Sequence, residues 1–408
     1  MKPRLLFISP FVPAPTGNGP AMRAASSICA LDAYFDVHLL VVGSAPCRHR
    51  GVEMQSMALR DSAFVPLRLW PDPQANAKHF LAAIPPLYRR CFPRPFEWQA
   101  MTQARFEYPF SETEFDVAHV FRLYAVPVLE SIRARATVRE TWLDLDDIES
   151  ATRLQLAALH RTRGEHLSAA HLAAEAEQYS SLEAARVRSF DRVFVCSADD
   201  RDHLQKHKIH DAPEIAPNIV SIPDRLPLKE RRNNPFQFLF VGSLGYLPNR
   251  DGLEWLVSEV LPRLRKAAPR PFVIRVVGAG LPRRVAEAIT SQPELELSGY
   301  VQDLDAVYRG ADAVIVPLRA GGGTRIKLLE AFAHGCPVIS TTEGARGIEA
   351  EPDRHLLITD PPFSFAEQCA RLMGDEDLST RLTQAAHELV RSRYGMASLV
   401  DALAPRPA

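Results

Sequence analysis

Short runs of apolar residues, rich in Val, Ile, Leu and Phe, alternate along the chain with longer segments of mixed apolar and polar residues. Continuous apolar runs are typical of parallel strands that are buried on both faces, and the segments between them have helical spacing. A first series of runs occupies 4–9, 36–42, 116–121, 138–145 and 192–197. A second series occupies 236–242, 272–278, 295–299, 312–318, 336–341 and 355–359. The pattern therefore predicts an α/β fold with two parallel sheets.

The two series predict two domains, since 408 residues exceed what one hydrophobic core usually organises. The stretch between them, "SIPDRLPLKERRNNPF" (221–236), contains prolines, charges and paired asparagines that disfavour helix and strand. We predict an N-terminal domain at 1–222, a linker at 223–235 and a C-terminal domain at 236–391. A last helix is expected within 392–408, and packing back on the N-terminal domain is an open alternative for it.

The composition limits the partners. Hydrophobic residues make up 46% of the chain and charged residues 24%, and the formal net charge of -1 gives no overall attraction to nucleic acid or anionic membranes.

No stretch reaches the roughly 20 apolar residues of a spanning helix. The six cysteines are scattered, without a Cys-x-x-Cys pair or a zinc-type spacing. Residues 151–189 predict an amphipathic helix or helix pair on the first domain. We expect a cytoplasmic protein that binds no nucleic acid.

One segment, "RAGGGTRIKLLEAFAHGCPVISTTEG" (319–344), places a glycine-rich turn between a predicted strand and a helix that should end at Gly335. Such a turn presents backbone N–H groups and the positive end of a helix dipole to an anion. The glycines allow close approach, the threonine can cap the helix or donate its hydroxyl, and the two cations suit a pyrophosphate. The candidate anion site consists of Gly321, Gly322, Gly323, Thr324, Arg325 and Lys327.

Glu330 lies further along the same predicted helix, on the face that carries Lys327. An acidic group beyond an anion pocket suits the paired hydroxyls of a sugar, as in dinucleotide folds. The alternative is an ordinary tight turn with an ion pair between Glu330 and Lys327. That alternative explains one glycine and one pair, so the full set of residues favours the anion site.

The chain resembles a known family at these residues and at several others. The segments similar to the second domain of the retaining glycosyltransferases of family 4, which have the GT-B fold, are "GGGTRIKLLEAFAHGCPVIST" (321–341), "FLFVGSLGYLPNRDGLEWLVSEVLP" (238–262), "RVVGAG" (275–280), "LSGYVQDLDAVYRGADAVIVPL" (297–318) and "APNIV" (216–220). The first half resembles the family less closely, through "SPFVPAPTGNGPAMRAASSICAL" (9–31) and "DVAHVF" (116–121). The resemblance implies two Rossmann-like domains facing across a cleft, the second holding a nucleotide sugar and the first the acceptor.

The resemblance also implies roles for single residues. Glu330 matches the carboxylate that binds the nucleotide ribose, and the glycine-rich turn matches the diphosphate region. Family members often carry an Arg soon after the glycine of the first strand in this domain, whereas here Gly242 is followed by Ser243. We keep both as donor-binding residues, with Arg325 and Lys327 supplying the missing charge. Many members place a second Glu, close to the transferred sugar, where this chain has Gly322.

Several further residues are candidates for the donor site. Gly17, Asn18 and Gly19 follow the first strand and could bring backbone amides to the donor, although a plain flexible turn explains them equally well. His119 ends an apolar strand, where a buried core histidine is the common case; the resemblance instead implies that it faces the transferred sugar. Gly278 belongs to a G-x-G that fits a turn near the nucleotide base.

Charged residues of the first half have open alternatives. Asp144, Asp146 and Asp147 end a predicted strand and could bind a metal, act as a base, or cap the following helix. Arg23 could reach a phosphate, but a solvated surface arginine is the commoner case.

These features together predict a retaining glycosyltransferase of polysaccharide or related biosynthesis. It would move a sugar from a nucleoside-diphosphate sugar to an acceptor hydroxyl, with His119, Arg325 and Lys327 as the catalytic candidates and without a cofactor or metal. The acceptor stays open among a glycan, a lipid-linked molecule and a small molecule, and Arg89, Arg90 and Arg94 allow peripheral contact with the inner face of a membrane. The alternatives are a catalytically silent GT-B nucleotide-sugar-binding protein and a nucleotide-sugar epimerase.

Overall fold

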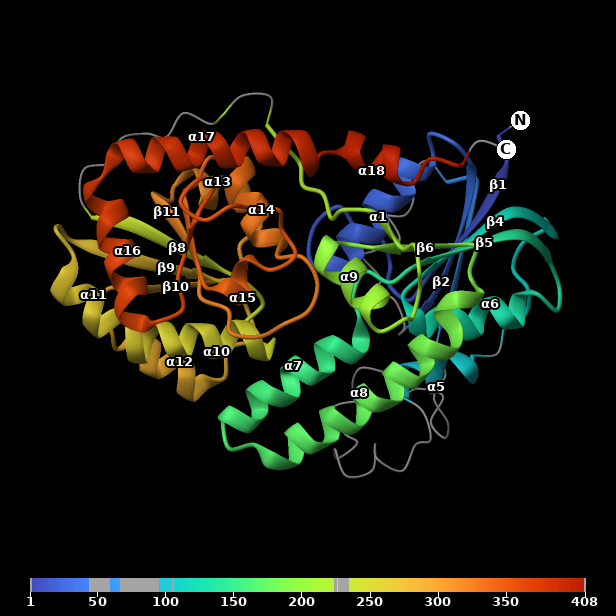
Figure 1. Cartoon of the computed structure of the whole chain (residues 1–408), viewed down its shortest axis with the longest axis horizontal. Helices are drawn as coiled ribbons and strands as arrows, with labels where there is room; N and C mark the ends of the chain where they lie inside the picture. The colour runs from blue at the N-terminus through green and yellow to red at the C-terminus, as the bar shows by residue number, and fades with distance from the viewer. Residues whose placement is uncertain are drawn as a thin grey trace. The chain divides into compact units, whose positions relative to one another are not determined.

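The chain folds into two compact units, each built on one parallel sheet (Figure 1). The computed structural model describes residues 2–43, 59–66, 95–104, 106–223, 226 and 235–406. The first unit comprises Met1–Asn218 with Met396–Ala408, and the second comprises Ile219–Gly395. Most of the predicted linker lies outside the described residues, as do Arg89, Arg90 and Arg94.

The first unit contains a seven-stranded sheet of order β3-β2-β1-β4-β5-β6-β7. Its strands are β1 (Arg4–Ser9), β2 (Asp36–Gly43), β3 (Asp61–Pro66), β4 (Glu114–Phe121), β5 (Thr137–Asp144), β6 (Arg192–Val195) and β7 (Glu214–Ile215). Every pair of neighbours is parallel. β1 pairs with β2 on one side and with β4 on the other, so the direction in which strands are added reverses there. Open α/β sheets bind ligands at the carboxyl ends of the strands at such a switch point.

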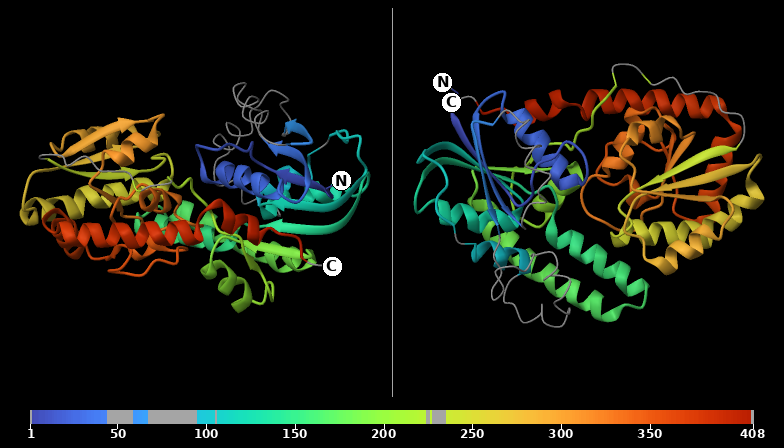
Figure 2. Two further views of the ribbon diagram at one scale, coloured as in Figure 1. Left: turned by 90° about the horizontal axis from the view of Figure 1, so that it is seen from above. Right: turned by 180° about the vertical axis from the view of Figure 1, so that it is seen from behind.

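The first unit also contains helices. They are α1 (Gly19–Leu31), α5 (Phe96–Thr102), α6 (Val126–Ile132), α7 (Glu149–Thr162), α8 (His166–Arg186), α9 (Ala198–Lys206) and α18 (Met396–Ala402), with single 3₁₀ turns η1 (Leu123–Ala125) and η2 (Val187–Ser189). α7 and α8 form an antiparallel pair, visible in Figures 1 and 2, around Gly164 at φ 74°. α18 packs on α1, and the guanidinium of Arg192 donates to the carbonyls of Ala402 and Ala404 at 3.1 and 2.8 Å.

The second unit contains a six-stranded sheet of order β10-β9-β8-β11-β12-β13, again with parallel neighbours. Its strands are β8 (Phe236–Val241), β9 (Phe272–Val277), β10 (Leu295–Gly299), β11 (Ala313–Val316), β12 (Val338–Ser340) and β13 (Leu357–Ile358). Both faces are buried: Phe238 and Phe240 belong to one core cluster, and Leu239 between them belongs to the other. This double burial explains the continuous apolar runs of the sequence.

The helices of the second unit are α10 (Leu247–Trp255), α11 (Leu261–Ala267), α12 (Arg283–Thr290), α13 (Leu304–Arg309), α14 (Ile326–Ala333), α15 (Thr342–Ala345), α16 (Pro362–Gly374) and α17 (Glu376–Arg393). A π-helical segment, η3 (Leu256–Val260), joins α10 to α11. β8 pairs with both β9 and β11, so the switch point of this sheet lies between β8 and β11.

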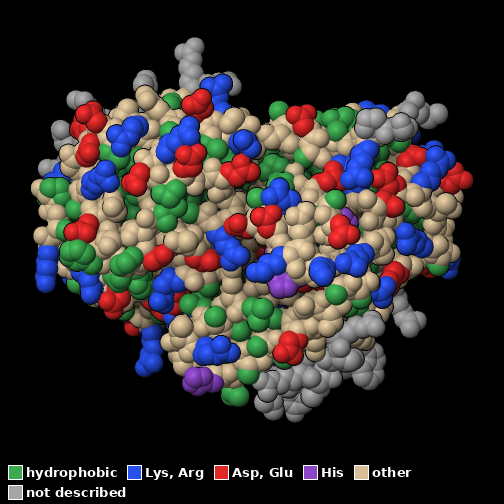
Figure 3. Space-filling view, in the orientation of Figure 1, with side chains coloured by type: hydrophobic (Ala, Val, Ile, Leu, Met, Phe, Trp, Pro, Cys, Tyr) green, Lys and Arg blue, Asp and Glu red, His purple; other side chains and the backbone are tan. Residues whose placement is uncertain are grey.

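Every strand predicted from the apolar runs is present, and the predicted helices at 151–189 and within 392–408 are confirmed as α7 with α8 and as α18. The short strands β3 and β7 were not predicted. Among the described residues, no helix combines the length and the apolar character needed to cross a membrane. Basic and acidic side chains are intermixed over the face drawn in Figure 3, as the net charge of -1 leads one to expect.

Candidate functional site

The predicted anion site lies at the switch point of the second sheet. The loop after β8 carries Gly242, and the loop between β11 and α14 carries the glycine-rich turn. Gly278 is required by close approach of the backbone, and Gly242 leaves room for neighbouring side chains. A Cβ atom on Gly278, which has φ 155°, would lie 1.9 Å from the carbonyl oxygen of Gly242. A Cβ atom on Gly242 would lie 2.8 Å from Nζ of Lys327. Both glycines therefore leave room at the carboxyl ends of β8 and β9.

Lys327 points from the first turn of α14 toward the end of β8. Its Nζ donates to Oδ1 of Asn249 at 2.6 Å and lies 5.5 Å from the centre of the Phe240 ring. No ion pair joins it to Glu330 among the described contacts, so the ordinary-turn alternative does not describe this residue. Burial, with a smaller contribution from nearby Arg325, lowers the pKa of Lys327 to about 7. A cation held by one neutral amide at a loop edge is suited to bind an anion.

Asn249 connects the loop after β8 to α14. Its Nδ2 donates to the carbonyl oxygen of Ser243 at 2.9 Å while its Oδ1 accepts from Lys327. Two residues later in α10, the buried carboxylate of Asp251 accepts two hydrogen bonds from Arg319, at 2.8 and 2.9 Å. That bidentate pair ties α10 to the loop after β11 and so fixes where Asn249 stands. Ser243 itself is exposed.

Arg325 holds the glycine-rich turn rather than reaching into open space. Its guanidinium is 6% exposed and donates to the carbonyl oxygens of Gly321 at 2.9 Å, Gly323 at 2.8 Å and also Gly322. It further pairs with Oε1 of Glu343 at 2.9 Å. The expectation that Arg325 shares phosphate charge with Lys327 does not fit this geometry, because Nη1 and Nη2 are already used and the remaining donor, Nε, is buried without a hydrogen-bond partner. The residue positions the turn.

Thr324 does not cap α14, which was one of the two roles expected for it. The N-cap residue of α14 is Arg325, and no side chain caps this helix. The hydroxyl of Thr324 is buried and has no hydrogen-bond partner. A buried hydroxyl without a partner costs free energy, which a ligand oxygen would recover. The hydroxyl of Thr324 can therefore still donate a hydrogen bond to a ligand.

Glu330 lies on α14 with one carboxylate oxygen oriented by a neighbour. The hydroxyl of Tyr308 donates to its Oε2 at 2.9 Å, and the Tyr308 ring stacks on His334 with centroids 5.0 Å apart. His334 in turn bonds Asp305 through Nε2 at 2.9 Å. Burial raises the pKa of Glu330. The arrangement holds one oxygen in place and is suited to accept hydrogen bonds from paired hydroxyls of a sugar.

In the first unit, Gly17, Asn18 and Gly19 follow β1 at its switch point. Gly17 is exposed with φ 114°, which favours glycine there. The side chain of Asn18 caps α1, because its Oδ1 accepts from the backbone N–H of Ala21 at 3.0 Å. Gly19 begins α1 and is half-buried. These residues form a helix entry whose backbone lies at the surface.

His119 is enclosed by aromatic rings in the sheet of the first unit. Its side chain is 0% exposed, stacks on Phe7 at 4.8 Å and lies 5.9 Å from Phe194 between ring centroids. Its Nε2 is 3.9 Å from Oδ2 of Asp144, too far for a hydrogen bond, and burial lowers its pKa. The structure therefore favours the core interpretation of His119 over a direct contact with a transferred sugar.

Buried ion pairs gather at the carboxyl ends of β4 and β5. Arg23, whose side chain is 1% exposed, donates through Nε and Nη2 to Asp144 at 2.9 to 3.1 Å, so the expectation of a solvated arginine is wrong. Burial alone would raise the pKa of Asp144, but Arg23 together with His119 lowers the pKa to about 2. Asp146, at φ 55°, pairs with Arg122, at φ 74°, over 2.7 Å. Neither Asp146 nor Asp147 caps α7, which has no side-chain cap.

Sequence reasoning missed Asn249 as the partner of Lys327 and Tyr308 as the partner of Glu330. They lie 78 and 22 residues from their partners, so no local spacing marks them. The only signal in the sequence was Glu330 itself, because a half-buried carboxylate needs a hydrogen-bond donor, and this predicts a partner without identifying it as Tyr308. Among the described residues, no group of side chains with metal-ligand spacing lies at this switch point.

Comparison with known sequences finds a family profile and two related proteins. Residues 235–375 match the profile of the family described as Glycosyl transferases group 1. Over 184 residues, 43% of the chain, the sequence is 29% identical to an exopolysaccharide phosphotransferase of Streptomyces coelicolor. Over 196 residues, 44% of the chain, it is 26% identical to an uncharacterized 44.6 kDa protein in the cps region of Klebsiella pneumoniae. These matches span only 19% and 46% of the lengths of the two relatives.

Solved structures resemble the chain along nearly all of its length. Sucrose-phosphate synthase of Thermosynechococcus elongatus superposes with a TM-score of 0.67 and 16% identity, covering 97% of this chain and 96% of that one. HepE of Anabaena, in complex with UDP and glucose, superposes with a TM-score of 0.63 and 14% identity, covering 98% and 97%. Identities at this level establish the fold alone. The predicted GT-B fold of two Rossmann-like α/β units is confirmed.

Proposed function

We propose that this chain, whose residues 235–375 match the profile of the glycosyl transferases group 1, is a glycosyltransferase. It moves a sugar from a nucleoside-diphosphate sugar to an acceptor hydroxyl with retention of the anomeric configuration. The observation that carries the proposal is the pairing of Lys327 with Asn249 at the switch point, beside a glycine-rich turn and a buried, unpaired hydroxyl. Together they offer one cation and a hydrogen-bond donor where a diphosphate would lie.

Three groups divide the work of holding the donor. The ammonium of Lys327 meets the diphosphate, and the hydroxyl of Thr324 donates to one of its oxygens. The free oxygen of Glu330 accepts from the ribose hydroxyls while Tyr308 holds the other oxygen at 2.9 Å. Arg325 keeps the turn in shape through its bonds to three glycine carbonyls. HepE, which has the same fold, binds UDP and glucose, and this supports a nucleotide-sugar donor.

The chemistry follows from where charge develops. When the bond between the sugar and the diphosphate breaks, negative charge grows on the leaving oxygen and Lys327 stabilises it. The acceptor hydroxyl attacks from the same face, and the departing phosphate takes its proton. We propose this course because this chain has Gly322 where many members of the family that it resembles carry a carboxylate, so no side chain at that position can act as a nucleophile. The proposal needs no metal, because Lys327 supplies the charge. We place the reaction in the cytoplasm, with a glycan or lipid-linked acceptor.

Binding of nucleotides tests the donor site first. The purified chain is titrated with UDP, GDP, ADP, TDP and CMP, with and without magnesium, and thermal shift reports binding. We expect a selective shift with one diphosphate that does not depend on magnesium. Incubation of the matching nucleotide sugar with candidate acceptors, followed by NMR of the anomeric proton, then reports transfer and its stereochemistry. Inversion would contradict the retaining course, and binding without transfer or hydrolysis would favour a catalytically silent protein.

The role of Glu330 is tested by two ligands that differ only in the nucleoside. Glu330→Ala should raise the Kd of the nucleoside diphosphate about tenfold or more, since a hydrogen bond to a charged group contributes about 1.5–3 kcal/mol. The Kd of inorganic pyrophosphate should stay the same. Glu351→Ala, an exposed carboxylate of the same unit, is the matched control and should change neither. Equal losses for both ligands in Glu330→Ala would refute the ribose role.

A further inference from the structure

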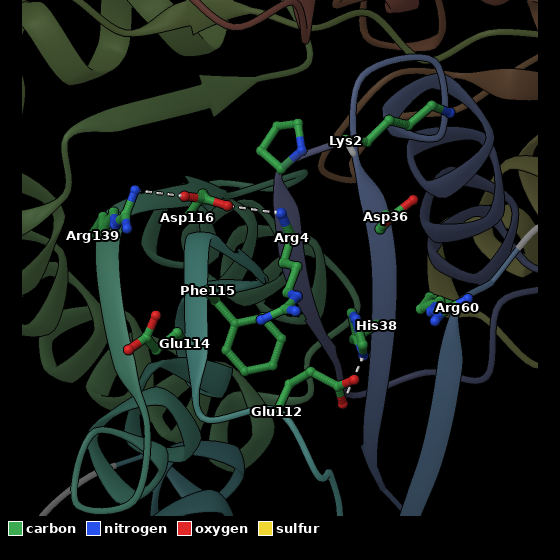
Figure 4. A pocket seen from close by; sticks show the side chains of 11 residues that line it. Lys2, Arg4, Asp36, His38, Arg60, Glu112, Glu114, Phe115, Asp116 and Arg139 are labelled. Carbon is green, nitrogen blue, oxygen red and sulfur yellow. Dashed lines mark hydrogen bonds and ion pairs between the residues drawn. The ribbon is translucent and has the colours of Figure 1, made fainter.

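A pocket of about 460 Å³ opens at the amino ends of the strands in the first unit, at the sheet edge away from the switch point (Figure 4). Its lining includes Arg4 of β1, His38 of β2 and Glu112, which lies just before β4. Four cations and four carboxylates line it, so its charge is balanced: Lys2, Arg4, Arg60, Arg139, Asp36, Glu112, Glu114 and Asp116. A pocket whose lining charges balance does not favour the binding of a free anion. The proposed glycosyl transfer uses none of these residues.

His38 carries a ring nitrogen with no hydrogen-bond partner. Its side chain is 1% exposed, and its Nδ1 is buried and unpartnered. Figure 4 shows the imidazole and Glu112 pointing toward each other, with Nδ1 and Oε2 at 3.9 Å, beyond hydrogen-bond distance. Phe110 and Phe115 meet the ring edge to face, with centroids 5.8 and 5.4 Å away, and fix its plane. A buried polar nitrogen left in this way needs a partner that the neighbouring side chains do not supply.

Two carboxylates, those of Asp61 and Glu112, lie close to the ring of His38. Asp61 begins β3, and the register of the parallel pair sets it directly beside His38. One oxygen of Asp61, one of Glu112 and one ring nitrogen of His38 all lie within 4.8 Å of one another. Ser111 donates to Oε2 of Glu112 at 2.9 Å and orients that carboxylate. Hydrogen-bonded support of this kind is typical of ligating carboxylates.

We propose that His38, Asp61 and Glu112 form a binding site for a divalent transition-metal ion such as Zn²⁺, with a fourth position left for water. Imidazole nitrogen with carboxylate oxygen is a donor set that Zn²⁺ accepts. Ligand atoms at about 2.0–2.2 Å from zinc lie roughly 3.3 Å apart in a tetrahedron. The exposed side chain of Asp61 and the partly exposed one of Glu112 rotate to close the remaining gap, while His38 stays fixed.

The protonation of the group agrees with this assignment. Burial lowers the pKa of His38, and the nearby guanidinium groups of Arg4 and Arg60 act in the same direction against Glu112 and Asp61. The hydrogen bond from Ser111 is the main cause that lowers the pKa of Glu112. The imidazole is therefore neutral and that carboxyl ionised near pH 7, which are the forms that bind metals. The ion would join edge strand β3 to β2 and to the segment before β4, and so stabilise the edge of the sheet.

The test measures zinc binding to the full chain, freed of tags and treated with EDTA. Equilibrium dialysis against ZnCl₂ gives the Kd, and the rise of Tm with zinc gives an independent readout. We expect Asp61→Asn and Glu112→Gln each to weaken zinc binding at least tenfold and to abolish the Tm rise. Glu114→Gln removes the same charge from the same pocket and should leave the Kd within threefold of the original. Both carboxylates are at least partly exposed, so these variants should fold, which circular dichroism checks.

A second possible zinc ligand pair must be separated from this group. The rings of His203 and His207, at the end of α9, lie 4.4 Å apart and could bind zinc on their own. The same titration on His207→Ala accounts for that pair, and the proposed site should remain in this variant. Binding that disappears in His207→Ala but survives in Asp61→Asn and Glu112→Gln would overturn the assignment. So would zinc binding weaker than millimolar in the unmodified chain. None of these outcomes depends on nucleotide binding or transfer, so failure here is distinct from failure of the proposed function.

Discussion

Binding of the donor should depend on pH through Lys327. Its pKa of about 7 in the free protein means that the ammonium loses its proton within the range where the protein can be assayed. A bound diphosphate stabilises the protonated form, so the ligand selects the charged lysine. As the pH rises through 7, the attraction is lost and the Kd must rise. The direction is opposite to that for a site whose binding requires deprotonation.

The magnitude follows from the fraction of lysine that is charged. With a pKa of about 7, about 90% is protonated at pH 6 and about 9% at pH 8, so the Kd should rise about tenfold, or 1.36 kcal/mol. The assay is calorimetric titration with the nucleotide sugar that the panel identifies, in buffers of pH 6, 7 and 8 at constant ionic strength. A nucleotide sugar is preferred to the free diphosphate, because a terminal phosphate loses its own second proton near a pKa of about 6.

Two variants separate Lys327 from other titrating groups. Lys327→Arg keeps its charge at every pH, so its Kd should not change between pH 6 and 8. Lys327→Met should bind at least about tenfold more weakly at pH 6, since a hydrogen bond to a charged group contributes about 1.5–3 kcal/mol, and it should also show no pH dependence. A flat Kd in the unmodified chain, or the same slope in Lys327→Met, would refute the reasoning.

The remaining predictions concern stability, measured by urea unfolding. Gly278→Ala should lower the free energy of unfolding by about 2 kcal/mol or more, because its Cβ would lie 1.9 Å from a carbonyl oxygen; Gly245→Ala, whose Cβ meets no atom nearer than 3.7 Å, is the control. Arg23→Met should cost about 3–5 kcal/mol by leaving Asp144 charged and buried, whereas the exposed Arg139→Met should cost less than about 1 kcal/mol. In the unmodified chain, the contribution of Asp144 is present above its unfolded pKa of about 4 and is lost as the pH falls toward its folded pKa of about 2.

The strands of both sheets could be predicted because each buried strand leaves a continuous apolar run. β3 could not, because this edge strand begins with two polar residues, Asp61 and Ser62, and its apolar run is short. β7 has only two residues, too few to show a pattern of apolar and polar positions. The end of α14 was readable from Gly335, which has φ 66° and follows the last turn. Local chemistry and local geometry coincide at such positions, and a single sequence is enough there.

The candidate site was only partly predictable, for the same physical reason. The turn at 321–324 and the residues Lys327 and Glu330 lie in one strand-loop-helix segment, so their spacing is informative. The partners of these residues come from elsewhere: Asn249 on α10 and Tyr308 on α13 are set by sheet order. Arg325 looked like a phosphate ligand by charge alone, and only its bonds to the glycine carbonyls assign it to the turn. A sequence shows which residues are charged, but it does not show which groups their side chains bind.

The return of α18 to α1 has a consequence for how the protein is made. The first unit is not complete when the ribosome has finished residue 218, because Met396–Ala402 and the carbonyls that Arg192 binds are still to come. The second unit, by contrast, is one uninterrupted stretch of chain and can fold while its C-terminal neighbour is still being synthesised. During synthesis the guanidinium of Arg192 can therefore pair only with Glu214 of β7 at first, and its contacts with Ala402 and Ala404 form after α18 has been made. Expression of residues 1–218 alone would leave this face of α1 uncovered, which makes a free-standing first half a poor choice for dissecting the two units.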